Sequence, residues 1–391
     1  MDAGHAGHAP APGDAAAGRF VAPAYGARSL SDVVPAVAHA LGVGRALDLA
    51  APSGLVLPDA PAYVVFLVDG LGARLLERHA DVAPFLSALA AGAEHATAGV
   101  PSTTATSLTS LGTGLVPGAH GLVGFTSRVP GTDRLFCPLQ WDDDIDPLEW
   151  QPHPTLFERL VGAGVAVTSV NRREYEGSGL TVAAHRGATY VGADRVGERI
   201  AAVQRAVALR PSLTYVYDAD LDWTGHRHGV ASAAWLQQLA MVDAEAEQLR
   251  EALPAEVRLV VVADHGMVDS PVHARVDVDD RPELLDGVWL LGGEARLRHL
   301  YCATRAVPDV IATWREVLGA GAEVLTREDA LERGWFGDTT AAVRPRLGDV
   351  VVACTGSTAV VSRRLFPHEA TLVGLHGSLT ADEMLIPVLV A

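Results

Sequence analysis

Four stretches of this chain are continuously apolar and are each closed by a polar residue or a turn. They are AYVVFLVDG from Ala62, GVAVTSV from Gly164, SLTYVYDAD from Ser212 and VRLVVVADHG from Val257. Apolar runs of this kind are typical of strands that are covered on both faces. Helical patterns such as TLFERLVGAG and SAAWLQQLAMVDAEAEQLREAL lie between them. The alternation predicts an α/β fold with a largely parallel central sheet and helices on both faces.

Two segments of the chain depart from this alternation of strands and helices. The first 25 residues are rich in Ala, Gly and Pro, which predicts a disordered tail over residues 1–25. One folded domain is expected over residues 26–391. From about residue 268 to residue 374 the pattern is less regular and is interrupted by Pro and Gly. This segment is expected to form a small cap on the main domain.

Composition narrows the possible partners and locations. The formal net charge of −17 argues against binding to a nucleic-acid polymer, because no basic stripe is present to neutralise phosphates. The three cysteines lie far apart and form no CxxC pair, which is typical of a reducing compartment. The sequence shows no signal-peptide pattern and no apolar run of about 18 residues. We therefore expect a cytoplasmic protein without a membrane segment; the sequence gives no sign of its oligomeric state.

Acidic residues follow three of the apolar runs. Asp69 closes the first run, Asp222 comes shortly after the third, and Asp264 with His265 closes the fourth. In open α/β sheets, ligands collect beyond the carboxyl ends of the strands. An adjacent carboxylate and imidazole are ligands that suit zinc. Three strands are therefore expected to deliver acids to one edge of the sheet.

The segment PSTTATSLTSLGTGLVPGAHG, from Pro101 to Gly121, contains eight Ser or Thr residues but no Cys, Lys or carboxylate. A bound metal ion can activate a hydroxyl at neutral pH without a side-chain base. The pattern predicts a helix that begins near Ser102 or Thr103, where free N–H groups favour an anion. Capping is the ordinary role of such hydroxyls, so most of them are expected to have no other.

Further histidines accompany the acids. In DWTGHRHG, Asp222 and His226 are four residues apart and His228 follows two residues later; GLHGS near the C-terminus contains His376. Each motif alone is as consistent with a solvated loop or a turn as with a metal ligand. Together the three aspartates and three histidines suffice for two metal sites.

The order of these motifs, from Asp69 to His376, resembles the alkaline phosphatase superfamily, and most closely its type I phosphodiesterase/nucleotide pyrophosphatase branch. The resemblance implies an alkaline-phosphatase-like fold and a pair of divalent metal ions, most often Zn²⁺, with Mn²⁺ as the other candidate. It also implies that Thr104, three residues after Pro101, is the nucleophile. The ligands implied for the first ion are Asp69, Thr104, Asp264 and His265, and those implied for the second are Asp222, His226 and His376.

One position departs from the family pattern. The family places an Asn 21 residues after the nucleophile, where it contacts a phosphoryl oxygen, but this chain has Phe125 there. Thr126 or Arg128 are candidates to replace that contact, and His228 is a candidate to touch the phosphate. The charged residues of GGEARLRHLY, which are Glu294, Arg296 and Arg298, are expected to lie on an exposed strand edge.

The resemblance implies a phosphoric ester hydrolase that acts on a small-molecule phosphate ester through a phospho-threonine intermediate. Two alternatives within the superfamily are a phosphomonoesterase and a phosphonate hydrolase. An alternative of another class is a structural metal-binding protein, in which the acids and histidines only stabilise the fold. The last alternative predicts that Thr104 is dispensable.

Overall fold

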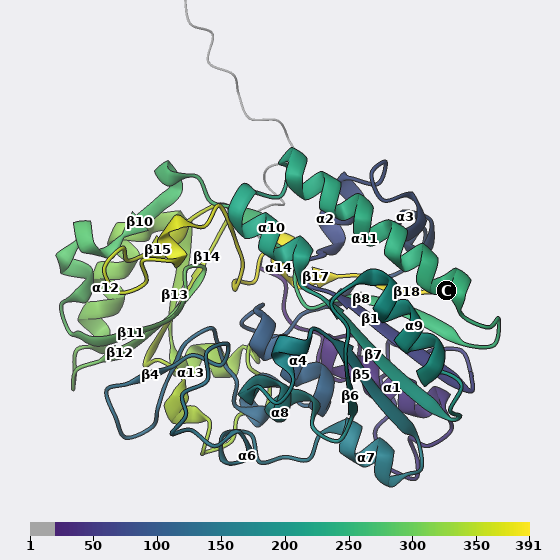
Figure 1. The fold of residues 1–391 in the computed structure, drawn as a ribbon. Coiled ribbons are helices and arrows are strands. Elements are labelled where there is room, and N and C mark those ends of the chain that lie inside the picture. The colour runs from purple at the N-terminus through teal and green to yellow at the C-terminus, as the bar shows by residue number, and fades with distance from the viewer. Residues whose placement is uncertain (1–19) are drawn as a thin grey trace, which may run out of the picture.

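The computed structural model describes residues 20–391 (Figure 1). Most of the tail expected over residues 1–25 lies outside this range. Its last six residues contact the folded domain: the Val21 N–H donates to the Leu379 carbonyl at 2.8 Å, and the Tyr25 hydroxyl donates to the Trp335 carbonyl at 2.9 Å. The ordered domain therefore begins before the predicted boundary at residue 26, because these contacts hold residues 20–25 in place.

The centre of the molecule is a six-stranded sheet. Five strands run parallel, and the C-terminal strand pairs antiparallel with the strand beside it. The strands of the four apolar runs lie next to one another in this sheet, which confirms the predicted α/β architecture. In order across the sheet the strands are β18 (Val388–Val390), β8 (Arg258–Ala263), β1 (Ala62–Val68), β7 (Ser212–Asp218), β5 (Ala166–Asn171) and β6 (Thr189–Gly192).

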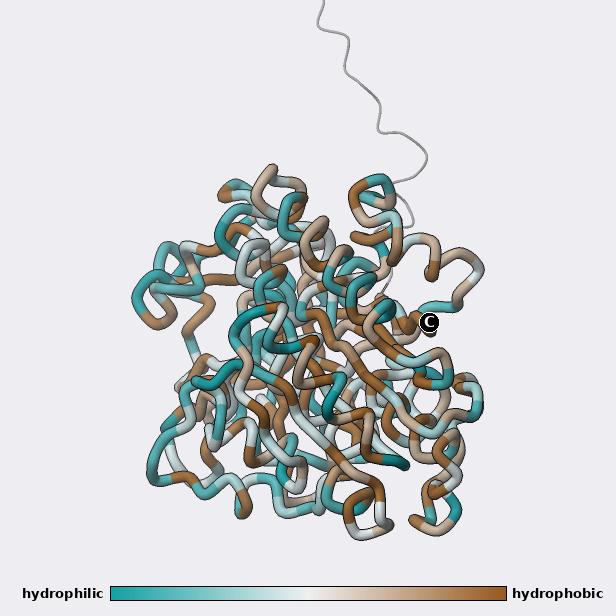
Figure 2. Tube along the Cα trace, turned by 45° about the vertical axis from the view of Figure 1, so that its right-hand side comes forward, coloured by the Kyte–Doolittle hydropathy of each residue, from teal (hydrophilic) through white to brown (hydrophobic). Residues whose placement is uncertain are grey.

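Helices cover both faces of this sheet (Figure 1). All residues of β1 and β7 are buried, as expected for strands between two helical layers. Figure 2 shows hydrophobic residues concentrated along the central strands. One group of mutually packed helices contains α1 (Val33–Ala40), α4 (Thr104–Thr113), α7 (Leu156–Gly162) and α8 (Gly179–His185). The other contains α2 (Ala73–Arg78), α3 (Pro84–Ala90), α9 (Val196–Ala206), α10 (Asp220–His228) and α11 (Ala233–Ala252).

A second, antiparallel sheet lies beside the main one and forms the cap (Figure 1). It has its own hydrophobic cluster around Trp314, Leu300 and Val352, and it falls within the segment expected to be a cap. Its strands, in order, are β11 (Val288–Glu294), β12 (Leu297–Cys302), β14 (Val350–Cys354) and β13 (Ala322–Thr326). Around it lie α12 (Val307–Leu318), α13 (Arg327–Glu332), β10 (Arg275–Asp277) and β15 (Ala359–Val361).

Short elements complete the fold. The small strand pairs are β9 (Val268–Asp269) with β16 (Gly374–Leu375), β2 (Ala96–Thr97) with β17 (Leu385–Ile386), and β3 (Ser127–Arg128) with β4 (Leu135–Phe136). The short α-helices are α5 (Pro117–His120), α6 (Pro147–Trp150) and α14 (Ala381–Met384). The 3-10 helices are Leu30–Asp32, Arg173–Tyr175, Val272–Ala274, Val278–Asp280, Pro282–Leu285, Gly319–Gly321, Arg344–Arg346 and Glu369–Thr371. Among residues 20–391, no helix has the length and hydropathy that a membrane span requires.

Candidate metal centre

Three neighbouring strands of the main sheet bring acids to one edge. Strands β8, β1 and β7 lie side by side and run parallel, so their carboxyl ends meet. Asp69 directly follows β1, Asp264 and His265 directly follow β8, and Asp222 lies in the first turn of α10, just after β7. The structure thus places at one edge the residues that the sequence predicts there.

The first group of ligand atoms belongs to Asp69, Asp264 and His265, and these atoms all lie within 4.8 Å of one another. The Thr104 hydroxyl adjoins this group: its Oγ1 lies 3.4 Å from Asp69 Oδ2 and 3.4 Å from His265 Nε2. Thr104 is the first residue of α4, and extended Thr103 precedes it as the N-cap. The N–H groups at this helix start have no partners within the helix, so they favour an anion beside Thr104.

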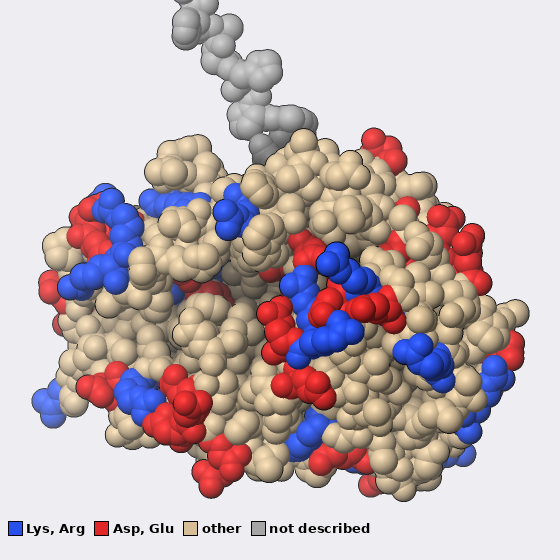
Figure 3. Space-filling view, viewed as in Figure 1, with Lys and Arg blue, Asp and Glu red and all other residues tan. Residues whose placement is uncertain are grey.

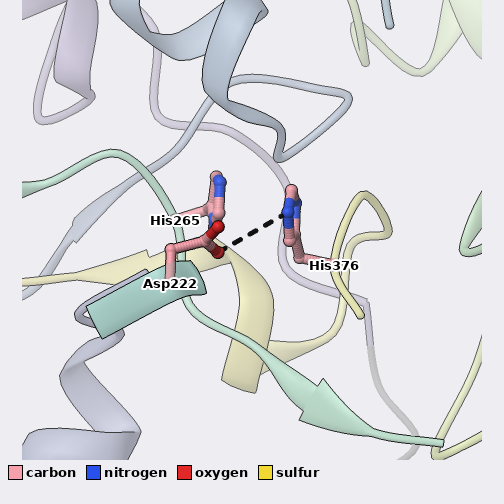
Figure 4. Close-up of side chains that lie close together, drawn as sticks. All are labelled: Asp222, His265 and His376. Atoms are coloured by element: carbon pink, nitrogen blue, oxygen red, sulfur yellow. Dashed lines mark ion pairs between the residues drawn. The ribbon is translucent and has the colours of Figure 1, made fainter. Parts of the chain in front are cut away.

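The second group contains Asp222, His226 and His376. His226 Nε2 lies 3.2 Å from Asp222 Oδ2 and 3.2 Å from His376 Nε2. Asp222 Oδ1 lies 3.8 Å from His376 Nε2, the contact drawn as a dashed line in Figure 4, and the His265 ring lies close to the same carboxylate. The ring centroids of His265 and His376 are 3.7 Å apart. The two groups are therefore contiguous.

All three imidazoles are held by the backbone in the same way. In each ring, Nδ1 lies within hydrogen-bond distance of a carbonyl oxygen, so Nδ1 carries the proton and Nε2 keeps its lone pair. Each Nε2 faces the acids of the two groups. This is the tautomer that binds a metal ion. The carbonyls belong to Gly374 at 2.7 Å from His226, to Gly266 at 3.0 Å from His265 and to Ser102 at 2.8 Å from His376.

Some oxygens of the three carboxylates accept hydrogen bonds, and others do not. Asp264 Oδ1 accepts the N–H groups of Gly70 and His265, at 3.0 and 2.9 Å, and Tyr217 donates its hydroxyl to Asp69 Oδ2. The oxygens Asp69 Oδ1, Asp222 Oδ1 and Asp264 Oδ2 are buried and have no hydrogen-bond partner in the described part of the chain. An unpaired buried carboxylate is costly. Divalent cations are the partners that this donor set lacks, so the residues present fit the metal pair that the resemblance implies.

The electrostatics of the acids agree with this interpretation. Burial, together with repulsion from Asp264 and Asp222, raises the pKa of Asp69 well above its usual value. Burial also raises the pKa of Asp264. Although burial opposes ionisation of Asp222, His226 beside it brings the pKa of Asp222 below its usual value when the imidazole, free of metal, takes up a proton. A bound cation would turn the repulsion between these acids into attraction.

A cavity of about 870 Å³ opens over the two groups. Asp69, Thr104 and Asp222 contribute to its floor, and Trp141 and Tyr175 belong to its walls. Figure 3 shows the molecule hollowed in this region, with acidic and basic side chains mixed around the hollow. The hydroxyl and the acids are therefore open to a ligand of small-molecule size.

The candidate substrate contacts lie elsewhere. Arg128 donates its Nε–H to the Thr132 carbonyl at 2.7 Å and does not line the cavity. Phe125, Thr126 and His228 do not line it either. His228 is exposed at the last residue of α10. Thr126 is buried, and its hydroxyl donates to the Gly293 carbonyl at 2.8 Å. Phe125 is half-buried, and its N–H donates to the Glu294 carboxylate at 2.7 Å. In this structure the four residues make other contacts or face solvent.

The expectation that Glu294, Arg296 and Arg298 lie on an exposed edge is wrong. All three are buried, because β12 is an inner strand of the cap sheet and β11 ends against the main domain. Tyr217, which donates to Asp69, was not anticipated. Its signal in the sequence is its place near the carboxyl end of β7, where the register sets it beside Leu67, two residues before Asp69.

The chain also matches a known protein family. Residues 63–379 match the family described as type I phosphodiesterase / nucleotide pyrophosphatase. The chain belongs to this family. Its members among curated proteins include ectonucleotide pyrophosphatase/phosphodiesterase family member 3 of Bos taurus, which is 25% identical over 228 residues, or 54% of this chain and 25% of that protein. Venom phosphodiesterase 2 of Crotalus adamanteus is 26% identical over 216 residues, or 52% of this chain and 26% of that protein.

The chain therefore spans about a quarter of the length of these relatives. Solved structures extend the likeness to most of the chain. Murine ectonucleotide pyrophosphatase / phosphodiesterase 5 aligns with a TM-score of 0.66 at 17% identity, covering 83% of this chain and 87% of that one. An inactive form of the same murine protein, in complex with AMP, aligns with a TM-score of 0.65. The likeness confirms the alkaline-phosphatase-like fold.

Proposed function

We propose that this protein is a two-metal phosphoric ester hydrolase of the phosphodiesterase or nucleotide pyrophosphatase type, with Thr104 as its nucleophile. The observation that carries the proposal is the position of Thr104 Oγ1, 3.4 Å from both Asp69 Oδ2 and His265 Nε2. Three carboxylate oxygens at the same edge have no hydrogen-bond partner among residues 20–391. Membership of the family and the AMP complex of the similarly folded murine protein support it.

The residues that would hold the ions form two sets. Zn²⁺ is the ion we propose, because the donors mix imidazole nitrogen with carboxylate oxygen, and Mn²⁺ is the alternative. Bound divalent ions would lower the pKa of the attacking hydroxyl and stabilise anionic oxygens. The first set is Asp69, Thr104, Asp264 and His265, and the second is Asp222, His226 and His376.

The chain itself supplies the nucleophile and its orientation. The Thr104 oxygen would displace the first alcohol from phosphorus, which gives a phosphoryl group on Thr104 and a free alcohol. Water would then displace the Thr104 oxygen and release the phosphate product. The Asp69 carboxylate lies within reach of the hydroxyl proton, and the start of α4 directs N–H groups toward the phosphoryl oxygens.

The size of the cavity supports a small-molecule substrate. Its volume of about 870 Å³ suits a nucleotide-sized ester, and the rings of Trp141, Tyr175 and Trp223 offer faces for a planar group. Asp142 and Asp143 also line it, so a nucleic-acid polymer would meet like charge at the entrance. We propose a small phosphate ester as the substrate.

The experiment compares bis-p-nitrophenyl phosphate with p-nitrophenyl phosphate, with added zinc and with chelator. We expect zinc-dependent cleavage of the diester and, in Thr104→Ala, a loss of kcat of at least about 10³-fold. Thr106→Ala is the matched control, because Thr106 lies in the same helix and its buried hydroxyl has no partner among the described residues. Retained activity in Thr104→Ala would contradict the proposal, and a preference for the monoester would make the protein a phosphatase.

The cytoplasmic location expected from the sequence stays a prediction. Cys137, Cys302 and Cys354 are free thiols in the structure, as is usual in a reducing compartment. Fractionation of cells that express the full-length protein tests it.

A further inference from the structure

Glu294 of the cap sheet has a buried carboxylate that faces the main domain and forms no ion pair within residues 20–391. It ends β11 and is 5% exposed. The two buried arginines nearby are already paired: Arg296 with Glu383 at 2.7 Å, and Arg298 with Glu369. A buried acid without a cation needs another explanation.

The contacts of Glu294 tie the cap to the segment that carries Phe125. Its Oε2 accepts the Phe125 N–H at 2.7 Å. The preceding residue, Gly293, donates its N–H to the Thr126 carbonyl at 2.9 Å and accepts the Thr126 hydroxyl at 2.8 Å. Three hydrogen bonds thus fix this segment to the end of β11. Glu294 Oε1 is buried and has no partner among the described residues.

Glu294 also adjoins the two segments that present Thr104 and His376. A Cβ on Gly377, the residue after His376, would lie 2.5 Å from Glu294 Cγ, so only glycine allows this approach. The Gly377 carbonyl accepts the N–H of Ser102, at 3.1 Å, just before α4 begins. The carboxylate therefore lies where the Phe125 segment, the start of α4 and the segment after His376 meet.

The surroundings favour the neutral acid. Burial raises the pKa of Glu294 to about 8, and the charge of Glu369 acts in the same direction. The Phe125 N–H, the Arg298 guanidinium and the Thr103 hydroxyl act in the opposite direction on this pKa. Glu294 accepts one hydrogen bond through Oε2, and its raised pKa favours the protonated carboxyl group near neutral pH.

We propose that Glu294 is a positioning residue, whose carboxyl group holds the Phe125 segment against the start of α4 and so fixes the direction of the Thr104 hydroxyl. The inference rests on the proposed function, because it assigns Glu294 to the same site. Through Glu294, the cap would contribute to the geometry of that site.

The first test compares Glu294→Gln and Glu294→Ala in zinc-dependent hydrolysis of bis-p-nitrophenyl phosphate between pH 6 and pH 10. Glutamine keeps the neutral shape and the acceptor, so we expect its kcat at pH 7 to stay within about threefold of the wild-type value. Alanine should lower kcat at least about tenfold with a smaller change in KM. The wild-type kcat should fall above about pH 8 by a step that Glu294→Gln lacks. Equal losses in both variants, or the same step in both proteins, would overturn the proposal.

The second test needs no activity, and so separates this inference from the proposed function. A raised carboxyl pKa means that the unfolded chain binds fewer protons than the native protein between the two pKa values. The stability from the neutral acid is complete below about pH 4.5 and is lost as the pH rises through about 8. The melting temperature of Glu294→Gln, relative to wild type, should therefore rise from pH 6 to pH 9.

Glu332→Gln on the exposed end of α13 is the control, and its difference from wild type should not change with pH. A flat difference for Glu294→Gln as well would show that Glu294 is charged when buried, and would overturn the inference even if the enzyme is active. If the wild-type protein hydrolyses none of the esters while the Glu294→Gln difference rises, the proposed function fails. The contact between the Glu294 carboxyl group and the Phe125 segment would then stand as a structural feature.

Discussion

Buried acids occur at two places in the molecule, in opposite states. Where the cap meets the main domain, Glu383 of α14 makes a two-point contact with Arg296, at 3.0 and 2.7 Å, and also accepts the Ser378 N–H and the Thr380 hydroxyl. At the edge of the main sheet, the charges of Asp264 and Asp222 oppose ionisation of Asp69, and Asp69 and Asp264 each have an oxygen without a hydrogen-bond partner in the described chain. The first arrangement is complete as folded, whereas the second is completed only by a cation. The paired acid therefore has a structural role, whereas the acids that lack partners are suited to binding a cation.

The largest effect is expected from a substitution among the acids at the edge of the main sheet. Asp69→Asn removes a ligand and should lower zinc-dependent hydrolysis at least about 10³-fold, because Asp69 faces the Thr104 hydroxyl. In chelator, the same variant should melt at a higher temperature than wild type, since it removes a repelled acid. Differential scanning calorimetry with and without chelator measures both states. A lower melting temperature in chelator would mean that the acids at this edge do not repel one another.

The next largest effect is expected from breaking the ion pair between Arg296 and Glu383. Arg296→Met leaves Glu383 buried without its partner and should lower the free energy of unfolding by about 3–5 kcal/mol. The double variant Arg296→Met/Glu383→Gln should recover most of this loss, because the amide oxygen can still accept from Ser378. Urea unfolding measures these values. If the single variant is no worse than the double, the pair is not the stabilising unit.

Stabilisation by added zinc should distinguish the acids at the main-sheet edge from the Arg296–Glu383 pair. Zinc at about 100 times its dissociation constant should stabilise the wild-type protein by about 2.7 kcal/mol per site, through preferential binding to the folded state. Zinc should stabilise Asp222→Asn less than the wild-type protein. It should stabilise Arg296→Met/Glu383→Gln as much as the wild type. Thermal melts over a zinc titration measure the shifts. An undiminished gain in Asp222→Asn would place the ion elsewhere.

The smallest effect concerns a residue that only orients a ligand. Tyr217→Phe removes the hydroxyl that donates to Asp69 and should weaken zinc binding about 10- to 100-fold, with the fold unchanged. Competition with a zinc indicator measures the affinity. Tyr63→Phe, whose hydroxyl contacts only the Pro58 carbonyl, is the matched control and should bind zinc as the wild type does.

How far the sequence predicts this molecule depends on the range of the contacts. The strands were predictable because their apolar runs are continuous, and the acids that close them meet because parallel strands end at one edge. Thr104 was predictable from its motif and from the helix start that it forms. Glu294 and Arg298 were mistaken for an exposed edge because their burial depends on residues far along the chain. The partner of Glu294, Phe125, is separated from it by 169 residues, and no local pattern records such a contact.

The central claim is that the unpaired edge of the main sheet is a site for two cations. Equilibrium dialysis of the full chain with zinc near neutral pH tests it directly, with Asp69→Asn and Asp222→Asn measured alongside. We expect two zinc ions per wild-type chain and no more than one tightly bound ion in either variant. No bound zinc in the wild-type chain, or two ions retained in both variants, would contradict it.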